Sequence, residues 1–345
     1  MISIDGSQME GGGQLLRMAT TYACILNKPI EVYNIRGKRK NPGLRPQHLA
    51  TVKTAAKICS GELEGSEIGS GEVTLHPRKI SGGDYSIDIG TAGSISLMLQ
   101  CLAPITLYAE SPTTISIRGG TDVNWSPPTI FLEKIVYPAL EKMGAPVKLT
   151  TEETGFYPKG GGKATFHSKP VNKLHHFAPE SMEIYDVNGL SKCGKLPSHI
   201  AQRQAKSADR LLHEAGFSTN IEVKNVSTLS PGSGICLWAE GKNVFIGADS
   251  YGERGKTAEK VGAEAANSLI KQIRTGANVD RHTADHLILP CSLAEGESKF
   301  KVSEITLHTL TSVEMARVFT DADITVDGKL GKPGTISVQG IGLRN

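Results

Sequence analysis

The N-terminal segment holds residues suited to binding an anion and a metal ion. Glu10 is followed by three consecutive glycines, and Gln14 and Arg17 come next, at the start of a predicted amphipathic helix. Consecutive glycines at a helix start are unfavourable for stability, but they leave backbone N–H groups free to approach an anion. Glu10 beside this turn is a candidate metal ligand. The alternative interpretation is a flexible glycine turn in front of a core helix.

A strongly basic segment follows the strand predicted at 29–35. Five Arg and Lys residues fall within positions 36–45, and no acidic residue occurs between Val32 and Gly61. Prolines and a glycine stiffen this loop, which makes it a candidate binding site for the phosphates of a nucleotide or a nucleic acid. No aromatic residue is interleaved with the cations, so base stacking is not predicted in this loop. The alternative interpretation is a solvated charged face.

His308 is a candidate nucleophile. It is predicted at the end of a strand at 299–305, directly before a helix at 311–319 whose start is marked by a capping box, Thr311 to Glu314. A neutral imidazole held on a rigid element can attack phosphorus if an acceptor holds its other ring nitrogen. The alternative interpretation is a histidine that only makes structural hydrogen bonds.

Two further histidines lie one helical turn apart. His282 and His286 share one face of the helix predicted at 282–293, and Asp285 lies between them. Such a set could bind a metal ion. Packing of the helix face or contact with a nucleotide explains the same pattern equally well.

Several common site types are excluded. Gly255-Lys256-Thr257 resembles the end of a P-loop, but that motif needs glycine where this chain has Ser250, and no GxGxxG occurs. The six cysteines are scattered without a CxxC pair, which excludes a disulfide framework and fits a reducing, cytoplasmic setting. The net charge of +3 does not mark the whole chain as a nucleic-acid binder. The longest apolar run, at 95–108, contains a glutamine and a proline, so no membrane span is expected.

The predicted elements repeat three times as helix, strand, helix, strand and strand, and the helices of the second unit begin about 80 residues after those of the first. The predicted helices are 12–26, 46–60, 92–103, 127–143, 282–293 and 311–319. The predicted strands are 29–35, 62–67, 72–77, 85–89, 106–118, 147–152, 163–167, 299–305, 323–326 and 335–339.

A separate set of elements interrupts the pattern between the second and third units. It comprises strands at 184–187 and 220–226, a hairpin at 235–239 and 243–249, and helices at 199–215 and 258–275. The predicted fold class is α+β, with three repeated βαβαββ-type subdomains around a centre and a smaller inserted α/β domain. The large domain would comprise 1–182 and 277–345, and the insert 183–276. Ligands would bind where the units meet.

The chain resembles the RNA 3'-terminal phosphate cyclases over essentially its full length. Six segments carry the resemblance, namely Asp5–Arg17, Arg36–Leu49, Gly82–Ser94, Gly119–Asp122, Gly155–Gly162 and Gly252–Gly255. The resemblance implies an enzyme that uses ATP and a divalent metal, Mg²⁺ or Mn²⁺, to convert an RNA 3'-phosphate into a 2',3'-cyclic phosphodiester, with release of AMP and diphosphate. It also implies three repeated subdomains and one inserted domain, in agreement with the elements predicted above.

The resemblance assigns roles to individual positions. The family nucleophile falls on His308, which would carry AMP as a phosphoramidate before AMP passes to the RNA 3'-phosphate and the vicinal 2'-OH closes the ring. Glu10 matches the metal ligand. The positions that match contacts to ATP are Gln14, Gln100, Pro127, His282, Thr283, Ala284, Asp285 and His286, with Pro127 and His282 on opposite sides of the adenine. The positions that match the phosphate pocket for the nucleotide or the RNA end are Arg17, Arg36, Arg39 and Gln47.

Two departures and two rival classes qualify this resemblance. His282 stands where some members have Tyr, and either ring can stack on adenine, whereas His286 stands in place of Gln and its contact is open. The family's non-catalytic relatives in ribosome biogenesis lack the nucleophilic histidine, so His308 argues against them. A carboxyvinyl-transfer enzyme of related architecture would need a sugar-acid pocket that these residues do not suggest. The expected partners are ATP and RNA with a 3'-phosphate end, with no membrane, and the size is compatible with a homodimer.

Overall fold

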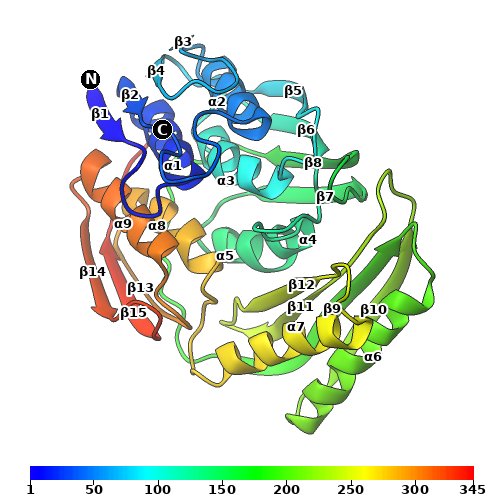
Figure 1. Ribbon diagram of the computed structural model, residues 1–345. Coiled ribbons are helices and arrows are strands. Elements are labelled where there is room, and N and C mark those ends of the chain that lie inside the picture. Colours follow the sequence, from blue (N-terminus) through cyan, green and yellow to red (C-terminus); the bar gives the residue numbers. More distant parts are fainter.

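The computed structural model describes residues 1–345 and contains four small β-sheets with helices packed among them (Figure 1). The mixed α+β class expected from the sequence is confirmed. None of the helices is both long and apolar enough to cross a lipid bilayer.

The first sheet has the strand order β1-β2-β4-β3. Strand β1 pairs in parallel with β2, and the remaining pairs are antiparallel. Helix α2 begins at a proline that follows the basic loop, as predicted. The elements of this part are β1 (Ile2–Asp5), α1 (Gly13–Leu26), β2 (Ile30–Tyr33), α2 (Pro46–Ile58), β3 (Glu62–Glu64) and β4 (Val73–His76).

The second sheet has the corresponding order β5-β6-β8-β7, again with one parallel and two antiparallel pairs. The predicted start of a strand at Thr106 is wrong, because α3 continues to this residue and β6 begins only at Thr113. Burial explains the longer helix, since Ile105 and Thr106 are fully buried in its last turn. The elements are β5 (Gly83–Asp88), α3 (Ile95–Thr106), β6 (Thr113–Gly119), α4 (Thr129–Phe131), the π-helix η1 (Leu132–Val136), α5 (Tyr137–Lys142), β7 (Val147–Glu153) and β8 (Gly162–Ser168).

The third sheet has only three strands, in the order β13-β15-β14. Residue Val279 makes a single parallel bridge to Val302 of β13, where the other two sheets have a full parallel strand. The elements are α8 (Thr283–Leu293), β13 (Glu297–Val302), α9 (Leu307–Phe319), β14 (Asp323–Gly328) and β15 (Gly334–Gln339).

Helix α9 begins earlier than predicted, and this changes the setting of His308. The side chain of Thr306 caps the helix by accepting a hydrogen bond from the Thr309 amide at 3.1 Å. Thr311, the expected cap, lies inside the helix, where its hydroxyl donates to the Leu307 carbonyl. His308 therefore lies in the first turn of α9, and its predicted position at a strand end is wrong.

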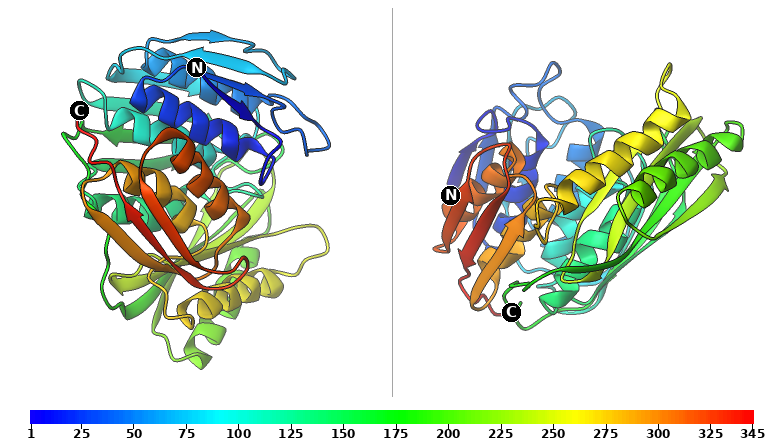
Figure 2. Two further views of the ribbon diagram at one scale, coloured as in Figure 1. Left: turned by 90° about the vertical axis from the view of Figure 1, so that its left-hand side faces the viewer. Right: turned by 90° about the horizontal axis from the view of Figure 1, so that it is seen from below.

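Residues 183–273 form the fourth sheet, in the order β10-β9-β11-β12, with helices α6 and α7 packed on it. Most of their apolar side chains form a second cluster, whereas Leu190, Cys236 and Trp238 belong to the main core. This part projects to one side of the molecule (Figure 2). The predicted hairpin is confirmed as β11 paired with β12. The elements are β9 (Glu183–Gly194), α6 (His199–Glu214), β10 (Thr219–Val226), β11 (Gly232–Lys242), β12 (Gly247–Tyr251) and α7 (Ala258–Ile273).

The main core holds helices from all three of the other parts. Helix α1 packs against α2, α3 and α9, and α8 packs against α9. Tyr22 of α1 stacks on Phe319 of α9, with ring centroids 5.2 Å apart. Packing of these helices brings segments from distant parts of the chain together at their N-terminal ends.

Candidate active site

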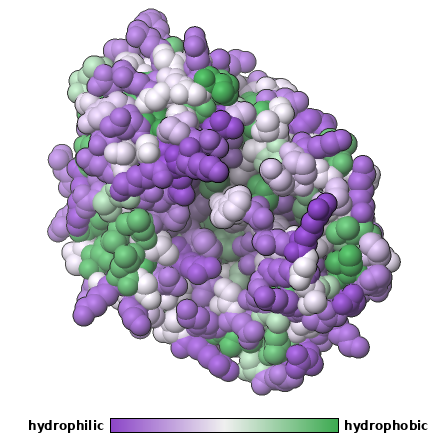
Figure 3. Space-filling view, in the orientation of Figure 1, coloured by the Kyte–Doolittle hydropathy of each residue, from purple (hydrophilic) through white to green (hydrophobic).

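A cavity of ≈ 930 Å³ opens where the helices of the core meet β12 of the fourth sheet. Residues at the N-terminal turns of α1, α2, α3, α8 and α9 all line it. Helix N-termini carry unpaired N–H groups and a partial positive charge, so their convergence favours an anionic ligand. Figure 3 shows this face hollowed near its middle, with mostly hydrophilic side chains around the hollow.

The cavity brings together nearly all of the site residues predicted from the sequence. Those that line it are Glu10, Gln14, Arg17, Arg36, Arg39, Gln47, Gln100, Pro127, His282, Asp285, His286 and His308. Thr283 and Ala284 are fully buried on α8 instead. The Thr283 hydroxyl donates to Asp280 at 2.8 Å, so this side chain stabilises the start of α8.

His308 is held by Gln14 across the interface of α9 and α1. The Nδ1 atom of His308 lies 2.5 Å from Oε1 of Gln14. The Gln14 amide nitrogen donates to the His308 carbonyl at 3.0 Å and to the Ser312 hydroxyl at 2.9 Å, which fixes the amide orientation. An amide oxygen only accepts hydrogen bonds, so Nδ1 carries the proton and Nε2 keeps a free lone pair.

The surroundings of His308 keep its imidazole neutral. Its ring faces the solvent of the cavity but is partly desolvated by the walls, and this desolvation, followed by the charges of Arg17 and Arg39, lowers its pKa to about 4. At neutral pH the ring is therefore an unprotonated nitrogen base, the form in which histidine acts as a nucleophile.

Cations line the cavity beside His308. Arg17 is buried on α1, and its Nε donates to the Gln100 side chain of α3 at 3.1 Å. Burial lowers the pKa of Arg17 to about 10, so it stays charged at neutral pH. Arg36 donates to the carbonyls of Asn41 and Gly43, which ties the basic loop into a fixed shape. The interpretation of this loop as only a solvated face is thus not supported.

The glycine turn is a packed wall of the cavity. A Cβ atom on Gly12 would lie 2.7 Å from a guanidinium nitrogen of Arg39, and one on Gly13 would collide with the ring of His48. The carboxylate of Glu10 pairs with Arg39 and accepts a hydrogen bond from the Gly12 amide at 2.8 Å. Glycine is needed here because charged side chains approach the backbone closely.

The carboxyl group of Asp285 is unusual because it is buried with one oxygen unpartnered. Burial raises its pKa to about 7, and its Oδ1 has no hydrogen-bond partner. Burial likewise lowers the pKa of the neighbouring His286 to about 3. No group of three or more His, Cys, Asp or Glu side chains is arranged to hold a metal ion, so Asp285 with the two histidines does not form a metal site. Instead, an orphaned buried acceptor favours a ligand that donates a hydrogen bond.

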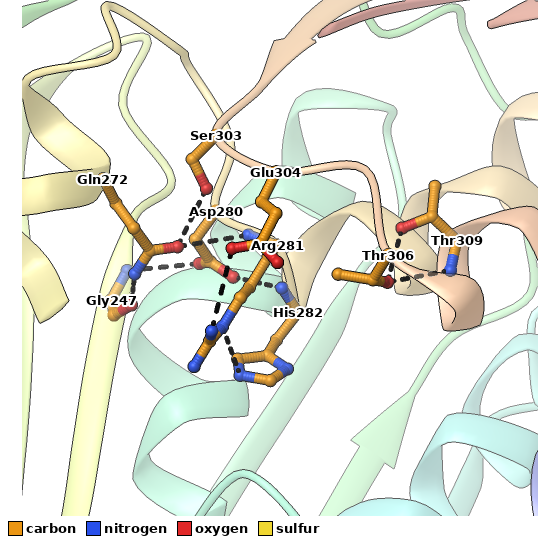
Figure 4. Close-up of polar contacts among 9 residues, drawn as sticks. All are labelled: Gly247, Gln272, Asp280, Arg281, His282, Ser303, Glu304, Thr306 and Thr309. Carbon is orange, nitrogen blue, oxygen red and sulfur yellow. Dashed lines mark hydrogen bonds and ion pairs between the residues drawn. The ribbon is translucent and has the colours of Figure 1, made fainter. Parts of the chain in front are cut away.

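A hydrogen-bond network joins the start of α8 to the fourth sheet (Figure 4). Asp280 accepts from the amides of His282 at 2.7 Å and Gly247 at 3.1 Å. Gln272 of α7 donates to the Gly247 carbonyl and accepts from the Ser303 hydroxyl. The Nε of Arg281 donates to Nε2 of His282 at 3.2 Å. The position of the His282 ring therefore depends on how α7 and β12 pack against the start of α8.

Some cavity residues were not predicted as part of the site. His48 was recognisable only as the end of the basic segment, although burial lowers its pKa to about 3. The residues of β12 and α7, and the aromatic side chains of Trp125 and Tyr157, also line the cavity. No local sequence pattern marks them, because they reach the cavity only through packing of the fourth sheet and of two loops.

Comparison with known proteins supplies an independent finding. The family model described as "RNA 3'-terminal phosphate cyclase" matches residues 8–326. Curated proteins named RNA 3'-terminal phosphate cyclase are similar to this chain over almost their whole length. They include those of Ignicoccus hospitalis, 42% identical over 99% of both chains, Pyrobaculum aerophilum, 44% identical over 99% of both, and Methanosarcina barkeri, 43% identical over 96% of this chain and 98% of the other.

Proposed function

The chain belongs to the RNA 3'-terminal phosphate cyclase family, and on this premise we propose that it converts an RNA 3'-phosphate end into a 2',3'-cyclic phosphodiester at the expense of ATP. The observation that carries the proposal is His308, a neutral imidazole with a free Nε2, held by Gln14 in a cavity lined by four arginines. A binding protein without chemistry would have no need for this arrangement.

We propose a covalent first step at His308. Its Nε2 attacks the α-phosphorus of ATP, a P–N bond forms, and the bond to the diphosphate leaving group breaks. Gln14 holds the Nδ1 proton and stabilises the positive charge that develops on the ring. Arg17, Arg36 and Arg39, together with the converging helix N-termini, neutralise charge on the phosphoryl oxygens.

The second and third steps would use the same phosphate site. An oxygen of the RNA 3'-phosphate attacks the phosphorus of the histidine adduct, and His308 leaves as the neutral base after AMP transfer. The vicinal 2'-OH then attacks the activated 3'-phosphorus, AMP leaves, and the hydroxyl proton passes to solvent. A neighbouring hydroxyl has a high effective molarity, so activation of the phosphate is sufficient for ring closure.

The residues present fit ATP and a divalent metal. The orphaned Oδ1 of Asp285 can accept from the exocyclic amine of adenine, between Pro127 and His282 on the cavity wall. Glu10 is the carboxylate that would hold the metal, in keeping with Mg²⁺ sites built from one or two carboxylates plus substrate phosphates. When bound, the metal would neutralise charge on the phosphoryl oxygens.

Conversion of a defined RNA tests the proposed activity. An oligoribonucleotide with a 3'-phosphate, incubated with ATP and metal, is expected to acquire an end that resists phosphatase until acid opens the ring. Binding of the RNA by folded protein without this conversion would instead identify a non-catalytic relative.

Substitution of Glu10 by glutamine is expected to slow formation of the protein–AMP adduct by at least about 100-fold at fixed metal concentration, equivalent to about 3 kcal/mol. The amide can still accept from the Gly12 N–H, so the turn is kept while the charge is lost. The measurement is the initial rate of label transfer from α-labelled ATP across a metal titration. Glu62→Gln, on the exposed strand β3, is the control. An unchanged metal requirement in Glu10→Gln would contradict the assignment.

The rate of adduct formation is expected to stay independent of His308 protonation down to about pH 5 and to fall below that, because its pKa is lowered to about 4 from an ordinary value near 6.5. Protonation removes the Nε2 lone pair, so the rate falls as pH falls. Asp285 titrates near neutral pH, so the profile is also measured in Asp285→Asn. If the rate in Asp285→Asn falls to half of its maximum at about pH 6.5, the pKa of His308 has its ordinary value and the prediction is wrong.

We also propose that the three sheets outside the insert are repeats of one unit. The first two share one strand order, and the third has the same order without its first strand. In this proposal 183–276 is an inserted domain, supported by the second apolar cluster that most of its buried apolar side chains form.

A further inference from the structure

Two large aromatic side chains at the cavity are left in solvent. Trp125 is 96% exposed and Tyr157 is 74% exposed, and both line the cavity. The only other tryptophan, Trp238, is 8% exposed and packs in the core. Large apolar surface left uncovered at a cavity marks a binding surface more often than a structural feature.

The two loops that carry these aromatic residues are joined to each other. Asp122 and Phe156 form a parallel β-bridge, and the Thr121 amide donates to the Gly155 carbonyl at 3.1 Å. Tyr157 directly follows Phe156 in one loop, and Trp125 lies three residues after Asp122 in the other loop. The aromatic residues therefore lie on one connected rim.

Trp125 is presented at some cost to the backbone. Its φ is +63°, a left-handed conformation that bulky residues rarely adopt. The loop is fixed on the far side of Trp125, where the Ser96 hydroxyl donates to the Pro127 carbonyl at 2.5 Å. Because the side chain of Trp125 is exposed, it adds no packing that would offset this backbone strain. Strain without such a gain in stability indicates a function at that position.

The placement of the rim relative to the charged residues suggests its ligand. The arginines line the same cavity as Trp125 and Tyr157, so a phosphate bound to the arginines would lie in a cavity bordered by the aromatic rim. Pro127 and the half-buried His282 enclose the proposed adenine site, whereas Trp125 and Tyr157 are open to solvent. An open aromatic surface suits a polymer that must leave the cavity, because every nucleobase has a face that can stack.

We propose that Trp125 and Tyr157 form a stacking platform for the nucleobases next to the 3'-phosphate of single-stranded RNA. This inference rests on the proposed cyclase function and adds the surface that holds the RNA strand. Because stacking tolerates all four bases, the platform would favour unpaired 3' ends with little preference for base identity.

Alanine variants test the platform. Trp125→Ala and Tyr157→Ala are each expected to raise the KM for a 3'-phosphate oligoribonucleotide by roughly 10- to 100-fold, with kcat at saturating RNA reduced less than KM is raised. Tyr185→Ala is the control, because Tyr185 is exposed on β9 but does not line the cavity. For an oligonucleotide with abasic residues at its last two positions, the KM of the two variants should equal that of the wild type. An unchanged KM for the normal oligonucleotide would overturn the proposal.

Fluorescence gives a second, direct readout. In Trp238→Phe the only tryptophan is Trp125, and its emission is expected to be quenched by the normal oligonucleotide but not by the abasic one. Quenching by ATP alone would assign the rim to the nucleotide, and a change in oligomeric state of Trp125→Ala with unchanged KM would assign it to a contact between copies; either overturns the proposal. Formation of the protein–AMP adduct without RNA is measured in parallel. If the wild-type protein forms no adduct, the proposed function is wrong. If the variants form the adduct normally and their KM for the oligoribonucleotide is unchanged, only the platform proposal is wrong.

Discussion

Replacement of His308 by alanine is expected to abolish the protein–AMP adduct, with a loss of more than about 10⁴-fold, because no other group can form the covalent bond. The fold should be retained. The side chain of His308 contacts Gln14, whereas the start of α9 is capped separately by Thr306. The change in free energy of unfolding is therefore expected to stay within about 1 kcal/mol.

The measurement is label transfer from α-labelled ATP to the protein on a denaturing gel, with the unfolding transition recorded for the same preparations. His199→Ala is the matched control, since His199 is the first residue of α6 but lies outside the cavity. A phosphoramidate adduct is labile in acid and stable in alkali. Retention of such a label in His308→Ala would place the nucleophile elsewhere, and absence of label from folded wild type in the presence of metal would favour a binding protein.

Gln14 illustrates what the structure adds to the sequence. The resemblance placed Gln14 among the contacts to ATP, and the structure adds that both N–H groups of its amide donate to α9 while its oxygen accepts from His308. No local pattern relates a residue near the N-terminus to one 294 positions later. The structure indicates that Gln14 fixes the tautomer of His308, which is a positioning role.

Element types were predictable where a local signal decides them. The start of α2 follows from proline at its first turn, and the hairpin of β11 and β12 follows from two short apolar runs. The start of α9 was missed because two threonine-containing segments can both cap a helix, and only the hydrogen bond to Thr306 distinguishes them. The end of α3 was missed because Pro104 is tolerated in its last turn, where burial outweighs the break that the residue predicts.

The cavity was predictable only in part, for a physical reason. Sequence motifs identified the cavity residues at helix starts, because glycines, prolines and charged residues occur there in recognisable patterns. The wall formed by β12 depends on how the strands of the fourth sheet pack against α4 and η1, and no residue of Gly247–Tyr251 shows this in the sequence. The packing in turn depends on side chains buried between the two parts, among which one ion pair is prominent.

This ion pair joins Lys192 of β9 to Asp122 in the loop after β6, with Nζ 2.7 Å from Oδ1 and 2.8 Å from Oδ2. Both side chains are almost completely buried, at 7% and 4% exposure. Asp122 also accepts from the Thr121 hydroxyl, which in turn accepts from the Gly155 amide. The pair therefore connects the insert to the loops that border the cavity.

Substitution of Lys192 by methionine is expected to lower the free energy of unfolding by about 3–5 kcal/mol, because it leaves a buried carboxylate without its partner. The double variant Lys192→Met, Asp122→Asn should regain most of this loss, since removal of both charges of a buried pair is often nearly neutral. Lys224→Met is the matched control. Lys224 lies opposite Lys192 in the register of β10 with β9, but its ion pair with Glu222 is exposed, so a change below about 1 kcal/mol is expected.

Denaturant unfolding of the four proteins measures these differences. Adduct formation measured at the same time should fall with the Lys192 single variant, because an insert that packs loosely withdraws β12 and disturbs the Asp280 contact that positions His282. A single variant as stable as Lys224→Met would show that the pair does not hold the insert in place. A stable double variant with normal adduct formation would show that each charge is needed only to neutralise the other. Packing of the surrounding apolar surface would then be sufficient to complete the cavity.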